Sequence, residues 1–91
     1  MRALVQSMVQ TSRADLLALQ ARIEQRDLPA ISDLAHRIKG PAQMIAASTI
    51  VECCEALERE SRSETPSFDT VEDSFRQLRE ALQALESSVG N

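Results

Sequence analysis

Three residues whose side chains, or lack of one, could serve a chemical reaction fall within one short segment. The sole histidine, the sole lysine and the only glycine before the last two residues of this 91-residue chain are His36, Lys39 and Gly40. A neutral imidazole is a competent nucleophile near pH 7. An ammonium group is a point cation for phosphoryl oxygens, and a glycine leaves room for an incoming surface. The segment therefore has the groups needed to handle a phosphoryl group.

The next residue, Pro41, follows Gly40 directly inside a helical pattern. In a helix interior, glycine costs about 1 kcal/mol and proline about 3 kcal/mol relative to alanine. The apolar pattern continues in phase to Ile45, so we expect one bent helix and not a break at Pro41. A sequence that keeps both residues beside its only imidazole uses this place for something other than stability.

The helical phase predicts which side chains share the surface with His36. At about 100° per residue, His36 lies roughly 140° from the middle of its helix's apolar stripe, and Gly40 roughly 180°. Gln43 lies roughly 120° and Lys39 roughly 80° from it. These four residues form one predicted patch, where Gln43 can donate a hydrogen bond to the imidazole or to a phosphoryl group. Arg37 points away from the patch centre, as a solvated charge or a docking contact.

The elements that position this patch are predicted to be helices over residues 2–26, 28–46, 49–62 and 69–89. Each carries an aliphatic stripe at helical spacing, which is clearest in Val71, Phe75, Leu78, Leu82 and Leu85 of the last helix. Short connections between amphipathic helices are typical of an antiparallel up-down bundle. The fold class is therefore all-α, with residues 1–91 forming a single four-helix domain.

Polar residues before the stripes predict how three helices begin. Asp27 is expected to cap the second helix, with Pro29 in its first turn. Thr49 and Glu52 fit a capping box for the third helix, with Ser48 as a competing cap. Asp69 or Thr70 is expected to cap the fourth.

Charge is unevenly distributed along the chain, whose net charge is −4. Residues 1–47 carry six basic and four acidic side chains, whereas residues 48–91 carry four basic and ten acidic ones. The acidic half and the lack of interleaved aromatic residues argue against nucleic-acid binding. The acidic run Glu52, Glu55 and Glu58–Glu60 is expected to be a solvated face.

The remaining composition limits localisation and metal binding. No apolar run approaches the roughly 20 residues that span a bilayer, so we expect a cytoplasmic domain without membrane contact. Adjacent helical residues point about 100° apart, so Cys53 and Cys54 share no metal and form no ordinary disulfide. They are expected to be small buried hydrophobic residues in a reducing compartment. Met44 is expected to fill the core or its rim.

The pattern His-x-Ile-Lys-Gly at residues 36–40 resembles the histidine phosphotransfer (HPt) domain. The resemblance continues through Ala42, Met44-Ile45 and Cys-Glu-Ala-Leu-Glu at residues 54–58, and covers roughly residues 13–60. It implies that His36 is the phosphorylated residue, that Lys39 and Gln43 are supporting polar groups, and that Gly40 provides clearance for docking. Two positions depart from the family: Pro41 stands where Ser or Ala is usual, and Ala46 where Gly is frequent.

The resemblance also implies the partners and the reaction. HPt domains pass phosphoryl groups between receiver-domain aspartates in multistep phosphorelays. The receiver of a response regulator would supply the acidic pocket and the Mg²⁺, so this domain needs no cofactor or metal of its own. The sequence has no nucleotide-binding motif, so no autonomous kinase activity is expected. We expect a monomer that is the C-terminal module of a hybrid sensor histidine kinase, on the cytoplasmic side of the membrane.

Two alternatives remain open at the level of sequence. The dimerisation and phosphoacceptor domain of a sensor histidine kinase also carries a helical histidine, with a proline five residues later, as Pro41 is. That family places an acid directly after the histidine, where this chain has Arg37. The other alternative is a non-catalytic helical adaptor in which the histidine is incidental.

The charge distribution predicts where a receiver docks. The first two helices are weakly basic, while the third and fourth are strongly acidic. A receiver with an acidic pocket should therefore dock across the first two helices around His36. Met8, Ser12 and Gln20 are the expected exposed rim residues.

Overall fold

Helices make up almost the entire chain. The computed structural model describes residues 2–90 and shows four helices in them: α1 (Arg2–Glu24), α2 (Leu28–Met44), α3 (Ser48–Ser61) and α4 (Phe68–Gly90). Each was predicted, with boundaries that differ by no more than two residues. Residues 1 and 91 of the predicted 1–91 domain lie outside the described part. The all-α fold class is confirmed.

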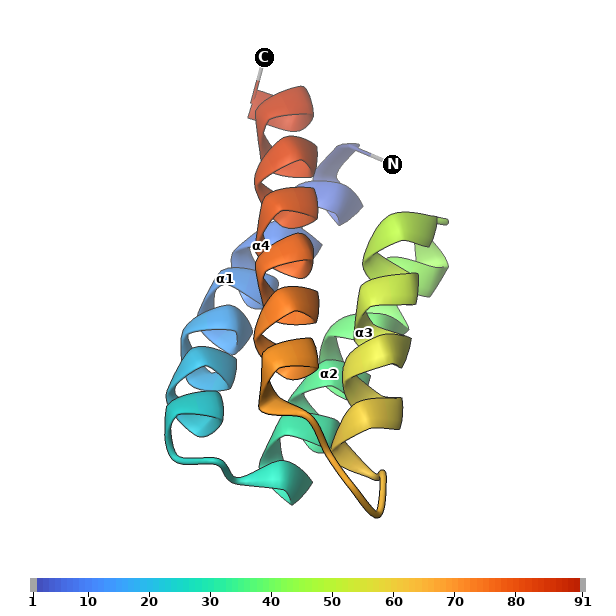
Figure 1. Ribbon diagram of the computed structural model, residues 1–91. Helices are drawn as coiled ribbons and strands as arrows, with labels where there is room; N and C mark the ends of the chain where they lie inside the picture. The colour runs from blue at the N-terminus through green and yellow to red at the C-terminus, as the bar shows by residue number, and fades with distance from the viewer. Residues whose placement is uncertain (1, 91) are drawn as a thin grey trace.

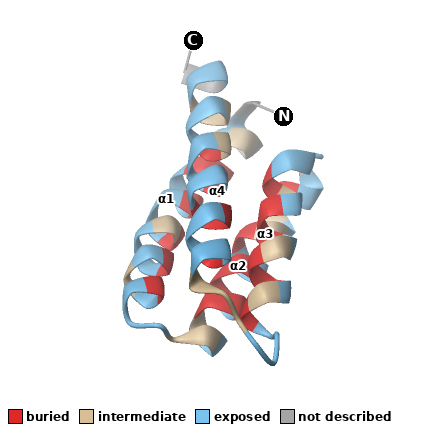
Figure 2. Ribbon diagram, in the orientation of Figure 1, coloured by how far each residue is buried: buried red, intermediate tan, exposed pale blue. Residues whose placement is uncertain are grey.

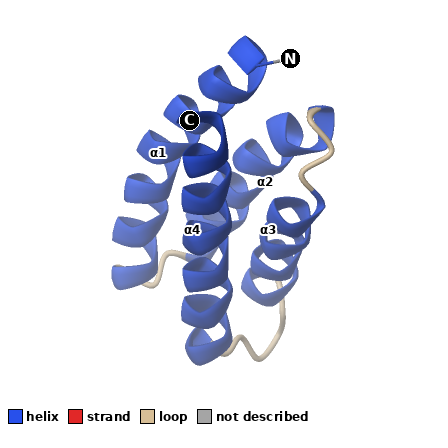
Figure 3. Ribbon diagram, turned by 90° about the horizontal axis from the view of Figure 1, so that it is seen from above, coloured by secondary structure: helices blue, strands red, loops and turns tan. Residues whose placement is uncertain are grey.

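The helices form a bundle in which the chain reverses direction after each helix (Figure 1). Helices α1 and α3 each pack against both α2 and α4, as the view from above also shows (Figure 3). Helix α2 therefore lies between α1 and α3, and its outward face is open to solvent. This arrangement gives the outward residues of α2 two different neighbours, one on each side.

The core lies along the axis of the bundle and consists of the predicted aliphatic stripes (Figure 2). Leu19, Ile31, Ile38, Leu57 and Leu78 from the four helices are almost completely buried. Complete burial of a side chain of this size contributes about 1.5–3 kcal/mol through the hydrophobic effect. The core thereby fixes the rotation of α2 and with it the outward direction of residues 36, 40 and 43.

The turns after α1 and α2 have the same geometry. The amide of Asp27 donates to the carbonyl of Arg22, and the amide of Ala47 donates to that of Ala42. These are the long hydrogen bonds of a Schellman motif, which places the preceding residue in the left-handed region. Arg26 and Ala46 both have φ of 57°, although neither is glycine. The chain therefore reverses sharply before and after α2 without glycine, the residue that favours this conformation.

The caps were predicted correctly for one helix of three. Asp27 caps α2 by accepting a hydrogen bond from the amide of Ala30, and Pro29 lies in the first turn. The prediction for α3 was wrong, because the helix begins at Ser48 and its cap, Ala47, has no side-chain hydrogen bond. Helix α4 is capped by the hydroxyl of Ser67, which accepts from the amide of Thr70. The amide of Ser67 in turn donates to Glu60, so the preceding loop fixes this start.

Helix α2 continues through Pro41, as predicted, and ends at Met44, two residues before the predicted end. Among the described residues, no helix has a long enough apolar stretch to cross a membrane.

Candidate functional site

His36 lies on the outward face of α2, and 71% of its side chain is exposed. This is the orientation that the helical phase predicted. Gly40 and Gln43, in the next two turns, are also exposed. The three predicted surface residues therefore share the solvent-facing side of one rigid helix.

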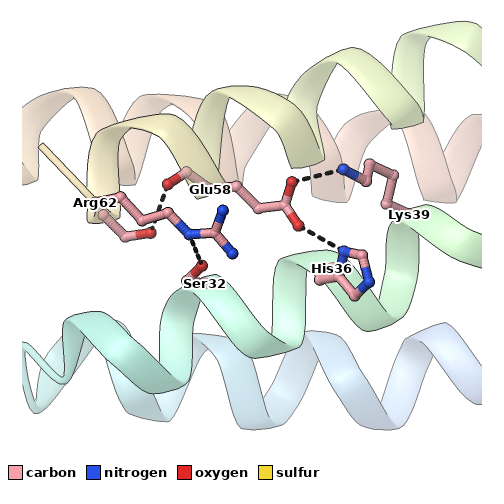
Figure 4. Close-up of polar contacts among 6 residues, drawn as sticks. Ser32, His36, Lys39, Glu58 and Arg62 are labelled. Atoms are coloured by element: carbon pink, nitrogen blue, oxygen red, sulfur yellow. Dashed lines mark hydrogen bonds and ion pairs between the residues drawn. The ribbon is translucent and has the colours of Figure 1, made fainter.

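A carboxylate from α3 holds the imidazole. The Nδ1 atom of His36 lies 3.0 Å from Oε1 of Glu58, while the other ring nitrogen points away from that carboxylate (Figure 4). The second carboxylate oxygen, Oε2, accepts a hydrogen bond of 2.7 Å from Nζ of Lys39. Glu58 therefore connects His36 and Lys39, the two chemically capable residues of α2.

Glu58 corrects the expectation that the acidic run of α3 is a solvated face. Glu52 and Glu55 are exposed, but the Glu58 side chain is only 10% exposed. It follows Leu57, which is fully buried, and so lies at the edge of the buried stripe that faces α2. A second bond between these helices, from Nε of Arg62 to the hydroxyl of Ser32, lies one turn further along (Figure 4).

The charge of Glu58 is favoured by its partners. Burial raises the pKa of Glu58, but the hydrogen bonds and charges of Lys39 and His36 together lower it more, with Lys39 contributing more than His36. The result is a pKa below the ordinary value of 4.5. An ionised carboxylate only accepts hydrogen bonds, so a neutral His36 must carry its proton on Nδ1. The lone pair of the neutral ring is therefore on Nε2.

Lys39 is not a freely solvated charge. Its side chain is 17% exposed, and its ammonium group bonds to Glu58. This hydrogen bond raises the pKa of Lys39 above its ordinary value of 10.5. The ammonium group is therefore committed to the carboxylate in this structure. The sequence placed Lys39 near His36 correctly but gave no sign that Glu58 lies between them.

Gly40 has open space where a side chain would begin. A Cβ atom built on Gly40 meets no heavy atom within 4 Å outside its own helix backbone. The backbone conformation does not require glycine either, since φ is positive only at Arg26 and Ala46 among the described residues. The residue therefore leaves the backbone of α2 uncovered beside His36. Within residues 2–90, the side-chain amide of Gln43 makes no hydrogen bond. Its predicted contact with the imidazole is therefore absent in this structure.

On the opposite side of α2, Arg37 faces α1. Its guanidinium lies 3.5 Å from the carboxylate of Asp15, a largely buried side chain. Arg37 itself is 65% exposed, so this long contact is a weak tether between α1 and α2. Arg37 is thus a partly solvated charge on the α1 side, and its predicted docking role stays a prediction.

Two of the expected rim residues of α1 were wrong. Met8 and Ser12 are buried, and only Gln20 of the three is exposed. Conversely, Met44 was expected to fill the core or its rim, but it is 71% exposed. Met44 of α2 therefore presents an exposed apolar side chain where the prediction had placed Met8 of α1.

The cysteines are buried and unpaired, as predicted. Burial raises the pKa of the Cys54 thiol to about 12, so this thiol is not reactive at neutral pH. In the described part of the chain, no three His, Cys, Asp or Glu side chains are grouped so that they could hold a metal ion.

Comparisons with known proteins identify a family and two relatives of this chain. A family model described as "Hpt domain" matches residues 3–88. The virulence sensor protein BvgS of Bordetella bronchiseptica is 31% identical over 88 residues, and BvgS of Bordetella pertussis has the same identity over the same length. Each match covers 97% of this chain but only 7% of BvgS. No solved structure matches the chain significantly.

Proposed function

Because the chain belongs to the Hpt (histidine phosphotransfer) domain family and so has a phosphorelay role, we propose that His36 is its phosphorylated residue. In this proposal, His36 accepts a phosphoryl group from the aspartyl phosphate of one receiver domain. It then passes the group to the aspartate of another receiver. The observation that carries the proposal is the exposed imidazole whose Nδ1 faces the carboxylate of Glu58.

The tautomer set by Glu58 suits an attack on phosphorus. The Nε2 lone pair of His36 forms the new P–N bond, and the P–O bond to the receiver's aspartate breaks. The bonding electrons leave with the aspartate, which becomes a carboxylate. The Nδ1 proton stays in place, so the ring gains a positive charge as the bond forms. The negative charge of Glu58, 3.0 Å from Nδ1, stabilises this developing charge.

Lys39 supports the same step through Glu58. It keeps the carboxylate ionised, and an ionised carboxylate is what holds the Nδ1 proton and offsets the ring charge. The absence of a side chain at Gly40 leaves room for the receiver to approach Nε2. Gln43, exposed one turn beyond Lys39, is available to donate a hydrogen bond to a phosphoryl oxygen.

The partner contributes the rest of the reaction. The receiver brings the acidic pocket and the Mg²⁺, and this domain brings the nucleophile. Phosphoaspartate and phosphohistidine are both high-energy species, so transfer is reversible. We propose no kinase activity for the domain alone. Its match to a small part of BvgS supports a place within a larger sensor chain.

The proposal is tested by transfer from a receiver domain carrying ³²P on its aspartate. Wild-type protein should gain a label that is labile in acid and stable in base, as expected for phosphohistidine. His36→Gln should gain none and should keep the helical circular dichroism of the wild type, because residue 36 is exposed. Asp33→Asn is the matched surface control, because Asp33 is also exposed on α2, and it should still be labelled. An acid-stable label, or a label on His36→Gln, would contradict the proposal.

A further inference from the structure

A groove lies between α1 and α4, on the side of the bundle opposite the contact between α2 and α3. Its volume is about 300 Å³, and its apolar lining consists of Val9, Leu16, Leu17, Phe75 and Leu82. Val9, Phe75 and Leu82 are buried and form the floor, whereas the Leu17 residue is 71% exposed. This face therefore presents an apolar hollow with an apolar side chain standing beside it.

The hollow and the projecting side chain make the face self-complementary. A two-fold axis that runs along the groove places Leu17 of each copy over the groove of the other, so one contact covers both side chains and both hollows. Ala14 and Ala21 lie three and four residues from Leu17 and so share its side of α1. Neither has a large side chain that would hold a second helix away.

The face has the area that a dimer of this kind needs. Helices α1 and α4 each contain 23 residues. At 1.5 Å per residue and about 10 Å in width, two such helices side by side present a face of roughly 700 Å². A standard protein interface covers about 800 Å² on each partner. Two copies joined here would therefore form a contact near the standard size.

Charged side chains on this face also complement each other. Arg13 forms an ion pair with Glu86, so these residues are level with each other on two helices that run in opposite directions. Eleven residues further along each helix, Glu24 is level with Phe75, one turn from Arg79. Glu24 and Arg79 are exposed, and neither has an ion pair within residues 2–90. The guanidinium of Arg79 lies over the ring of Phe75 instead, 5.7 Å from its centroid. An axis parallel to the helices keeps these levels, so Glu24 of one copy approaches Arg79 of the other.

We propose that the chain forms a two-fold symmetric dimer through the groove between α1 and α4. Leu17 of each copy fills the groove of the other, and Glu24 of each copy faces Arg79 of the other. This inference departs from the monomer expected from the sequence, and it does not rest on the proposed function. The outward face of α2 stays free, so the two copies of His36 remain accessible in the dimer.

Sedimentation equilibrium of the whole chain tests the dimer between about 10 µM and about 1 mM, the range of weak specific association. The wild type should show a reversible monomer–dimer equilibrium there. Leu17→Glu should keep the helical circular dichroism but weaken the dimer by at least about tenfold, because its carboxylate would be buried in an apolar groove. Met44→Glu is the matched control, since Met44 is also 71% exposed but lies on α2, and it should dimerise as the wild type does. A monomeric wild type, or equal weakening by both variants, would overturn the inference.

An exchange of charges tests how the two copies are arranged. Glu24→Arg alone and Arg79→Glu alone each place like charges against each other, so each should weaken the dimer by about tenfold. An equimolar mixture of the two variants should dimerise as the wild type does, because each copy supplies the charge that the other lacks. Mixing cannot restore an ion pair within one copy. A mixture that associates no better than the separate variants would overturn the proposed arrangement.

Discussion

The middle of α2 and its C-terminal end make opposite use of two small residues. Gly40 lies within the helix, where alanine is favoured and where a Cβ atom would meet nothing within 4 Å. Ala46 lies in the turn after the helix with φ of 57°, where glycine is favoured. Each residue thus occupies the conformation that suits the other. Conformational stability therefore explains neither the glycine at residue 40 nor the alanine at residue 46.

The difference indicates what each region is for. At Gly40 the chain gives up helix stability and gains an unobstructed surface one turn from His36. At Ala46 the turn is held by its hydrogen bonds, in which the amides of Ala46 and Ala47 donate to carbonyls of α2. Under the proposed function, the middle of α2 therefore serves access and chemistry, whereas its end serves chain reversal. Substitutions in the middle should change phosphotransfer, while substitutions in the turn should change stability alone.

After His36 itself, the largest effect is expected at Glu58, the α3 residue that contacts the middle of α2. Glu58→Gln keeps the size of the side chain but removes the charge that holds the Nδ1 proton and faces Lys39. Loss of a charge-assisted hydrogen bond predicts a decrease in the transfer rate on the order of ten- to a hundredfold. Imidazole ¹⁵N shifts should show the neutral ring of His36 moving away from the Nδ1–H tautomer, which a purely structural role for Glu58 would not cause.

The matched control is the carboxylate on the other side of α2. Asp15→Asn removes the charge that faces Arg37 at 3.5 Å, in a contact that does not touch the imidazole. It should change the transfer rate by less than about twofold, since a contact of 3.5 Å to a largely exposed guanidinium contributes little. If both variants slow transfer equally, the carboxylates act through the fold, and the special role of Glu58 is wrong.

A reciprocal exchange tests the two small residues. Gly40→Ala should raise the free energy of unfolding by about 0.5–1 kcal/mol, because alanine favours the helix and meets no neighbour there. Ala46→Gly should also raise it, by about 1 kcal/mol, because it relieves the left-handed conformation of a residue with a Cβ atom. Urea denaturation measures both changes.

Phosphotransfer then separates the two positions. Gly40→Gln should keep the fold and slow transfer from a receiver by steric blocking, whereas Ala46→Gly should leave transfer unchanged. Arg26→Gly offers a second turn of the same geometry, and it should gain stability as Ala46→Gly does. A normal transfer rate in Gly40→Gln would show that clearance is not the reason for the glycine.

Much of this organisation can be predicted from the sequence. The periodic stripes give the helices and their inward faces, because core burial fixes the rotation of each helix. The same periodicity gives the outward position of His36. The caps of α3 and α4 were less predictable. Helix α3 begins after Ala47, without a side-chain cap, although Ser48 and Thr49 follow directly. At α4 several polar residues near the start compete, and the loop decides among them. Ser67 prevails for α4 with the help of Glu60, a contact between residues seven positions apart.

The contact between Glu58 and His36 illustrates the limit more clearly. Lys39 lies roughly 80° from the apolar stripe of α2, and Glu58 lies at a similar angle from that of α3. Periodicity places each residue at the flank of its helix but does not say which flanks face each other. That depends on the order of helices around the bundle, which brings the two flanks together.

The smallest expected effect concerns pH and the Lys39–Glu58 pair. The folded-state pKa of Glu58 lies below 4.5, so its contribution to stability is present above 4.5 and is lost as pH falls through the folded value. The folded-state pKa of Lys39 lies above 10.5, so its contribution is present below 10.5 and is lost as pH rises through the folded value. Lys39→Met should therefore lower the free energy of unfolding most near pH 7, and the difference from wild type should shrink towards both extremes. Urea denaturation across this range measures the difference.

Arg37→Met, which removes the exposed partner of Asp15, should show a small difference at every pH. A Lys39→Met difference as small and flat as that of Arg37→Met would mean that the two sides of α2 are electrostatically alike, contrary to the chemical role inferred for the α3 side alone.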